Sequence, residues 1–140
     1  MNKLTVLLIE DDEIEQMKFQ RIVQKQEISH HICIANQGEQ ALEMLLEEQL
    51  LPDIILLDLH MPKINGIDFL QKIRTVDHLA YIPIIVLTTS ANPSDIQECY
   101  KQGASGYIIK PLEHEHYRQK INALIAYWQE NEIVKGHYQN

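Results

Sequence analysis

The chain has 140 residues, 45% of them hydrophobic and 23% charged, which is typical of one globular domain and excludes a disordered segment. The formal net charge of −8 argues against a nucleic-acid surface, because no clustered Lys and Arg residues stand ready to neutralise phosphates. No apolar run approaches the roughly 20 residues of a membrane span, and the N-terminus lacks a signal-peptide layout, so we expect a cytoplasmic protein without membrane association.

Apolar runs rich in Val, Ile and Leu alternate with segments whose apolar residues recur at three- and four-residue steps. The first pattern predicts strands and the second predicts helices. Cys33 and Cys99 lie in different segments, outside any zinc-ligand spacing, and are expected to be reduced thiols. In chain order we predict strands at 4–9, 31–35, 53–58, 84–88 and 107–110, and helices at 13–26, 38–49, 66–76, 94–102 and 114–130.

Strands that alternate with helices of this length pair in parallel through right-handed crossovers, so that helices cover both faces of the sheet. The predicted fold class is therefore α/β, a doubly wound five-stranded parallel sheet flanked by five helices. We expect one domain over 1–131 and a tail over 132–140 that frays. Neither a linker nor a second periodic region is visible, so no output domain is expected.

Polar residues stand at the ends of four predicted strands, and the carboxyl ends of parallel strands share one edge of a sheet. Asp11 and Asp12 follow the first strand, Asp58 ends the third, Thr88 ends the fourth and Lys110 ends the fifth. Crowded carboxylates repel one another, and Mg²⁺ with oxygen ligands is the expected relief. The hydroxyl of Thr88 and the ammonium of Lys110 can bind phosphoryl oxygens. An aspartyl phosphate formed on Asp58 is therefore the simplest chemistry consistent with these groups.

Each of these residues also has a structural interpretation when it is taken alone. Asp11 and Asp12 precede a helix, where Asp commonly caps free amides. Asp58 could begin a turn, Thr88 could be an ordinary strand residue and Lys110 could be a solvated charge. Their assembly at one edge favours the functional interpretation.

Four segments together resemble a response-regulator receiver domain in order and spacing. They are LLIEDD (7–12), IILLDLHMP (54–62) followed by Gly66, PIIVLTTS (83–90) and GASGYIIKP (103–111), and the resemblance covers roughly the first 125 residues. It implies the flavodoxin-like strand order 2-1-3-4-5.

The resemblance also implies roles for individual residues around the metal. Asp58 would be the phosphoacceptor and a metal ligand, and Asp12 would bind Mg²⁺ directly. Asp11 would reach the ion mainly through water, and the main-chain carbonyl of His60 would complete the protein ligands.

Other implied roles concern the switch. Thr88 would follow the phosphoryl group and Tyr107 would change between outward and inward positions, which alters the face built by the helix at 94–102, the strand at 107–110 and the helix at 114–130. Lys110 would pair with a phosphoryl oxygen, and the bond between Lys110 and Pro111 would be cis.

As a receiver domain, the protein would take its phosphoryl group from the phosphohistidine of a sensor histidine kinase. It would assist its own phosphorylation and dephosphorylation without being an enzyme on an external substrate, and it would act on a target protein or a histidine phosphotransfer protein. The LTTS segment ending at Ser90 and the pair Tyr127-Trp128 are similar to stand-alone receivers that partner phytochrome-type sensor kinases. Such receivers dimerise through the same switch face, so a homodimer is expected.

The side chain of His60, two positions after Asp58, is placed to modulate the attack of water on a phosphoryl group. The other histidines are scattered without a metal-site spacing and are expected at the surface. In the last helix, apolar residues at three- and four-residue steps predict packing on the sheet, and Trp128, late in that helix, is a candidate interface anchor.

Three alternative functions remain open to different degrees. A phosphatase of the haloacid dehalogenase type needs a second Asp two residues after the nucleophile, where this chain has His60. A flavin binder needs a phosphate-cradling loop after the first strand, where an acidic run from Glu10 to Glu13 would repel phosphate. A receiver-like module that binds proteins without phosphorylation is the main alternative.

Overall fold

Five parallel strands form one sheet in the order β2-β1-β3-β4-β5, as the resemblance implied. The computed structural model describes residues 3–134. The predicted fold class is confirmed, and each predicted strand is found with ends shifted by a residue or less. The strands are β1 (Thr5–Ile9), β2 (His31–Ala35), β3 (Ile54–Leu57), β4 (Ile84–Thr88) and β5 (Gly106–Ile109).

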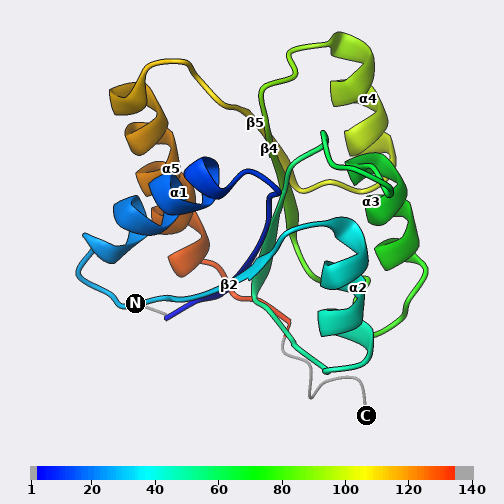
Figure 1. The fold of residues 1–140 in the computed structure, drawn as a ribbon. Helices are drawn as coiled ribbons and strands as arrows, with labels where there is room; N and C mark the ends of the chain where they lie inside the picture. The colour runs from blue at the N-terminus through cyan, green and yellow to red at the C-terminus, as the bar shows by residue number, and fades with distance from the viewer. Residues whose placement is uncertain (1–2, 135–140) are drawn as a thin grey trace.

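Four helices connect the strands, a fifth follows β5, and together they cover both faces of the sheet (Figure 1). In Figure 1, α1 and α5 lie together on one face, and α2, α3 and α4 lie on the other. The largest boundary difference is in α2, which ends at Leu46 instead of 49. Gln49 has a φ of 59°, a left-handed conformation that does not continue a right-handed helix. The helices are α1 (Glu13–Gln24), α2 (Gly38–Leu46), α3 (Gly66–Arg74), α4 (Pro93–Lys101) and α5 (His114–Gln129).

The sheet separates two apolar layers, because successive residues of a strand point to opposite faces. On the first strand, Leu7 and Ile9 pack under α2, α3 and α4, whereas Val6 and Leu8 pack under α1 and α5. All four residues of β3 are buried. Burial on both faces is what a parallel sheet with helices on each side requires.

Polar side chains cap the starts of three of the helices that follow strands. The side chain of Asp12 accepts hydrogen bonds at the start of α1, Asn65 does so for α3, and Asn92 for α4. Gly66, the first residue of α3, lies against the loop after β3: a Cβ there would sit 2.8 Å from Leu59 Cα. This close approach fixes where that loop runs.

Two expectations are corrected by the backbone and the side-chain contacts. Every peptide bond in residues 3–134 is trans, including the one between Lys110 and Pro111, which follows the intrinsic preference of roughly 0.5–1 kcal/mol for the trans form. His30 is half-buried instead of free at the surface, because its Nδ1 accepts a hydrogen bond from the backbone of Leu4 at 2.9 Å.

Trp128 packs against the apolar layer under α1 and α5 and meets Tyr127 edge-to-face at 5.2 Å between ring centroids. It therefore contributes to the core. Cys33 and Cys99 are free thiols, as expected. No helix within residues 3–134 is long and apolar enough to cross a membrane. The predicted tail at 132–140 falls outside the described residues from 135 onward.

Candidate functional site

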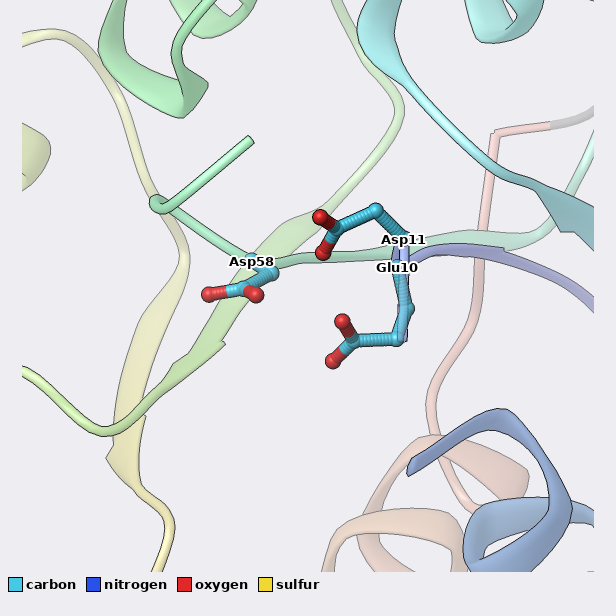
Figure 2. Close-up of side chains that lie close together, drawn as sticks. All are labelled: Glu10, Asp11 and Asp58. Atoms are coloured by element: carbon cyan, nitrogen blue, oxygen red, sulfur yellow. The ribbon is translucent and has the colours of Figure 1, made fainter. Parts of the chain in front are cut away.

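Three carboxylates meet where β1 and β3 end. These strands are neighbours, with Ile9 paired to Leu57, so the residues that follow them are adjacent in space. Glu10, Asp11 and Asp58 each offer a carboxylate oxygen, and the three oxygens lie within 4.8 Å of one another. Figure 2 shows the side chains of Glu10 and Asp11 leaving the end of β1 on the side of Asp58.

The three acids differ in their exposure to water. Glu10 is 3% exposed and Asp58 is 9% exposed, whereas Asp11 is open to solvent. An oxygen of Asp58 accepts a hydrogen bond from the backbone N–H of His60 at 3.3 Å, which helps to orient its carboxylate. Asp58 is thus a fixed, mostly buried carboxylate with a neighbouring acid on the solvent side.

Lys110, directly after β5, brings a buried positive charge to the same edge. Its Nζ lies 2.5 Å from Oε1 of Glu10 and 3.7 Å from Oε1 of Glu15. Burial acts to lower the pKa of Lys110, but the hydrogen bond and charge of Glu10, with further contributions from Asp58 and Glu15, outweigh burial and raise it. The ammonium therefore stays charged among the carboxylates.

Glu10 is the acid most affected by its surroundings. Burial, the largest effect, raises the pKa of Glu10 to about 7 against the opposing hydrogen bond and charge of Lys110, and the charge of Asp58 raises it further. One ammonium, that of Lys110, thus faces the three carboxyl groups of the cluster. A site of this kind favours an additional cation with a preference for oxygen ligands.

Asp12 does not join the acidic cluster, contrary to its predicted role as a direct metal ligand. Its Oδ1 accepts hydrogen bonds from the backbone N–H groups of Ile14 at 2.8 Å and Glu15 at 3.3 Å, so its carboxylate is occupied as the cap of α1. Glu10, which was not predicted as a site residue, lies in the cluster instead of Asp12. Its backbone still pairs with Ala35 of β2 at 3.0 Å, so it continues the strand into the site.

Thr88 and Tyr107 lie on the neighbouring strands β4 and β5. Thr88 is fully buried as the last residue of β4, and its backbone carbonyl accepts from the N–H of Lys110 at 2.7 Å. The hydroxyl of Tyr107 donates to the backbone carbonyl of Ser90 at 2.9 Å. Tyr107 is therefore half-buried and tied to the loop that follows β4.

His60 lies exposed in the loop after β3, and its backbone, not its ring, contacts Asp58. The role of its carbonyl as a metal ligand stays a prediction. The structure thus brings Asp11, Asp58, Thr88 and Lys110 to one edge of the sheet and adds Glu10 and Glu15 around the ammonium.

A doubly wound α/β domain with an acidic cluster at the carboxyl edge of its sheet is the architecture of receiver domains. The family model described as response regulator receiver domain matches residues 6–122. The chain belongs to this family of two-component signalling proteins.

Several relatives are similar over nearly their whole length. The probable methanogenesis regulatory protein FilR2 of Methanothrix harundinacea is 33% identical over 127 residues, covering 88% of this chain and 82% of the relative. The response regulator Rcp1 of Synechocystis is 29% identical over 130 residues, covering 89% of this chain and 88% of that protein. Other relatives are longer, and the chain spans 15% of one and 51% of another.

Solved structures agree with this assignment. The Mn²⁺-bound form of Rcp1 superposes with a TM-score of 0.86 at 28% identity, covering 94% of this chain and 98% of that one. The phosphorylated cyanobacterial phytochrome response regulator RcpA has a TM-score of 0.88 at 26% identity, with coverages of 96% and 99%. These structural neighbours include phytochrome-associated response regulators.

Proposed function

We propose that the protein is a response regulator whose receiver domain accepts a phosphoryl group on Asp58 from the phosphohistidine of a sensor histidine kinase. The observation that carries this proposal is the position of Asp58: it is buried directly after β3, has a carboxylate oxygen within 4.8 Å of those of two other acids, and lies near the buried ammonium of Lys110. The family membership supports the same function. The phytochrome-associated neighbours favour a kinase partner of the phytochrome type.

The donor set at the edge of the sheet fits Mg²⁺. Carboxylates of Asp11 and Asp58 and the carbonyl of His60 are hard oxygen ligands, and the exposure of Asp11 leaves space for water. Glu10 lies within the cluster but is held by Lys110, so its contribution is the negative charge next to the ion. When bound, Mg²⁺ would offset the charge of the incoming phosphoryl oxygens.

The reaction is an in-line displacement in which a carboxylate oxygen of Asp58 forms a bond to phosphorus. The bond between phosphorus and the imidazole nitrogen of the donor breaks, and that nitrogen leaves as neutral imidazole after protonation. Lys110 moves its hydrogen bond from Glu10 to a phosphoryl oxygen, and Thr88 donates its hydroxyl to another. The protein assists only its own phosphorylation and dephosphorylation.

The phosphoryl group is read out on the face formed by α4, β5 and α5. The bond that Tyr107 donates to the Ser90 carbonyl ties its ring to the loop after β4, and this loop follows Thr88 directly. A shift of Thr88 toward the phosphoryl group would therefore move this loop and change the hydrogen bond between Tyr107 and Ser90. The altered face would recruit a second copy, a target protein or a histidine phosphotransfer protein.

The kinase would approach from the side of α1 that borders the acidic site. Ile14 is 69% exposed and Met17 is 48% exposed, and these apolar side chains stand three residues apart at the start of the helix. Neighbouring apolar side chains on one helical face favour a helical partner. Both residues lie in the first turns of α1, which begins two residues after Asp11 of the acidic cluster, so a kinase docked there would have its phosphohistidine on the side of Asp58.

A mass measurement tests the phosphoacceptor. The protein is incubated with Mg²⁺ and a small phosphodonor, beside Asp58→Asn and a matched control, Asp77→Asn, at an exposed position away from the site. We expect one phosphoryl adduct on the wild type and on the control, no adduct on Asp58→Asn, and none after chelation of the metal. Absence of an adduct from all samples would favour a receiver-like module that binds proteins without phosphorylation.

The ring of His60 is proposed to tune the lifetime of the phosphorylated state, because it stands exposed two positions after Asp58. Replacing His60 with Asn is expected to change the rate at which phosphate is lost. An unchanged lifetime would remove this role while leaving the phosphoacceptor assignment intact.

A further inference from the structure

A groove of about 600 Å³ runs between α1 and α5, on the face of the sheet where these two helices lie together (Figure 1). It is separate from the acidic edge described above. At one end, the side chain of Gln26 donates to Asn122 of α5 at 2.8 Å and joins the two walls. The apolar residues of the lining are Ile22, Ile28 and Ala126.

The walls of the groove carry clustered positive charge, in a protein whose net charge is −8. Lys18, Arg21 and Lys25 recur at three- and four-residue steps along α1 and its cap, so they share one helical face, and Arg118 faces them from α5. Glu27 is the one acidic residue in the lining. This cluster could not be seen in the sequence, because it combines a periodic stripe on α1 with Arg118, which lies 93 or more positions further along the chain.

The cations are not all neutralised within the protein. Lys18 pairs with Glu15 at 3.0 Å, and Arg118 pairs with Glu115 on its own helix. Arg21 and Lys25, however, have no ion-pair partner among residues 3–134 and are exposed. These two unpaired cations stand one turn apart beside the apolar residues of the lining. Together they offer a binding surface for a segment that carries both carboxylates and apolar side chains.

The residues that line the groove also argue against nucleic-acid and phosphate ligands. Neither Phe, Tyr nor Trp lines it, and the imidazole of His114 is the one ring in the lining, so the groove offers no series of rings on which a single-stranded nucleic acid would stack. Its residues belong to helix sides and a short loop, without a glycine-rich turn whose backbone amides could cradle phosphate.

We propose that the groove between α1 and α5 is a docking site for an acidic, amphipathic segment of a partner protein. Carboxylates of the segment pair with Arg21 and Lys25, and its apolar side chains pack on Ile22 and Ala126. The net charge of −8 repels an acidic partner overall, whereas the four cations of the groove give such a segment charge complementarity. The proposal does not depend on phosphorylation of Asp58.

The test uses the whole protein and a labelled amphipathic peptide with Leu along one helical stripe and Glu along the other, beside a peptide with every Glu replaced by Gln. Binding is followed by fluorescence anisotropy at low salt and located by amide chemical shifts. The double variant Arg21→Glu with Lys25→Glu is compared with a control, Lys72→Glu with Lys101→Glu. All four cations stand at or next to the C-terminal ends of helices, so the two variants change the net charge and the helix ends equally.

We expect the Glu peptide to bind with shifts confined to α1 and α5, and the Gln peptide to bind at least about tenfold more weakly. The groove variant should weaken binding at least about tenfold and the control less than about twofold. Failure to bind, or equal loss in both variants, would overturn the proposal. Displacement of the peptide by ATP or inorganic phosphate at equal charge concentration would assign the groove to small anions instead. Salt-dependent self-association of the protein that is lost in the groove variant would assign the groove to a second copy of the chain.

Discussion

Glu10 and Asp12 stand two positions apart, yet their carboxylates have different surroundings. Glu10 continues β1 and enters the acidic cluster, whereas Asp12 turns away to cap α1. The residue types alone do not separate these roles, since a run of acids after a strand suits both. The distinguishing signal is the distance along the sequence from Ile9, the last apolar residue of the strand. The first two residues after Ile9 reach the site, and the third, Asp12, caps the helix.

This difference predicts opposite effects of two neighbouring substitutions. Asp12→Ala removes a helix cap and should lower the free energy of unfolding by about 1 kcal/mol while leaving Mg²⁺ affinity nearly unchanged. Asp11→Asn removes a ligand and should weaken Mg²⁺ binding by roughly tenfold or more, with the metal-free stability unchanged or raised because like charges are removed. Urea unfolding and Mg²⁺ titration of both variants measure these effects. A larger loss of Mg²⁺ affinity in Asp12→Ala would restore Asp12 as the ligand.

The buried thiol of Cys99 predicts a loss of stability at alkaline pH. Burial, with the negative charges of Asp95 and Glu98, raises the pKa of Cys99 from 9.0 to about 11. Between these values the unfolded chain has released a proton that the folded protein retains, so the free energy of unfolding falls as the pH rises through this window. Urea unfolding across the window should give a shallower pH dependence for Cys99→Ala. An identical slope would show that other groups, such as Tyr117, cause the loss.

At the scale of elements, every predicted strand and helix was found, because their apolar periodicity is dictated by packing on a doubly covered sheet. Helix ends were less predictable, since they depend on conformations such as the positive φ of Gln49. The strand order came from the resemblance to a family, because periodicity does not specify which strands are neighbours. The cis bond implied by that resemblance is not found before Pro111.

The junction between β3 and α3 should tolerate no side chain at Gly66. A Cβ at this position would lie 2.8 Å from Leu59 Cα and 2.9 Å from the carbonyl oxygen of Asp58, and backbone atoms do not yield easily. Gly66→Ala should therefore lower the free energy of unfolding by about 1–3 kcal/mol. Gly106→Ala, whose Cβ would meet Ile85 at 3.4 Å, is the control and should have a smaller effect in the same urea experiment. Equal losses would contradict the close-contact explanation.

Arg74 links the end of α3 to two loops on the opposite edge from the acidic site. Its guanidinium donates to the carbonyls of Ala80 at 2.9 Å, Ile82 at 2.8 Å and Gly103 at 2.7 Å. Arg74→Ala leaves these carbonyls without their donor and should lower the free energy of unfolding by about 2–4 kcal/mol. Arg74→Lys keeps the charge but cannot span three acceptors, so thermal unfolding should show recovery of less than half the loss. Full recovery would mean that charge alone matters.

At the scale of the whole molecule, the sequence predicted that polar residues after several strands gather at one edge, because parallel strands deliver their carboxyl ends there. Asp58, Thr88 and Lys110 are far apart in the chain, but the topology leaves them one place to meet. No comparable rule gathers residues from the sides of two helices, so the basic groove between α1 and α5 went unpredicted. Its charge becomes apparent only when the packing of Arg118 against α1 is known.

The switch face predicts a change in oligomeric state. Tyr100 on α4 is 51% exposed and Leu112 before α5 is fully exposed, so apolar surface is available at this face. Sedimentation with beryllofluoride and Mg²⁺ should show a dimer that Tyr100→Glu with Leu112→Glu abolishes. Tyr81→Glu, at a residue 69% exposed on another part of the surface, should leave the dimer intact. A monomer under all conditions would exclude dimerisation as the output.

The central claim is that Asp58 carries the phosphoryl group, and the most direct measurement is the location of the modified residue. After phosphorylation in Mg²⁺, reduction with borohydride converts an aspartyl phosphate to homoserine, which tandem mass spectrometry places in the sequence. We predict homoserine at position 58 only, and none when the phosphodonor or Mg²⁺ is omitted. Homoserine at Asp11 or Asp12, or a phosphoryl group on a histidine instead, would contradict the account.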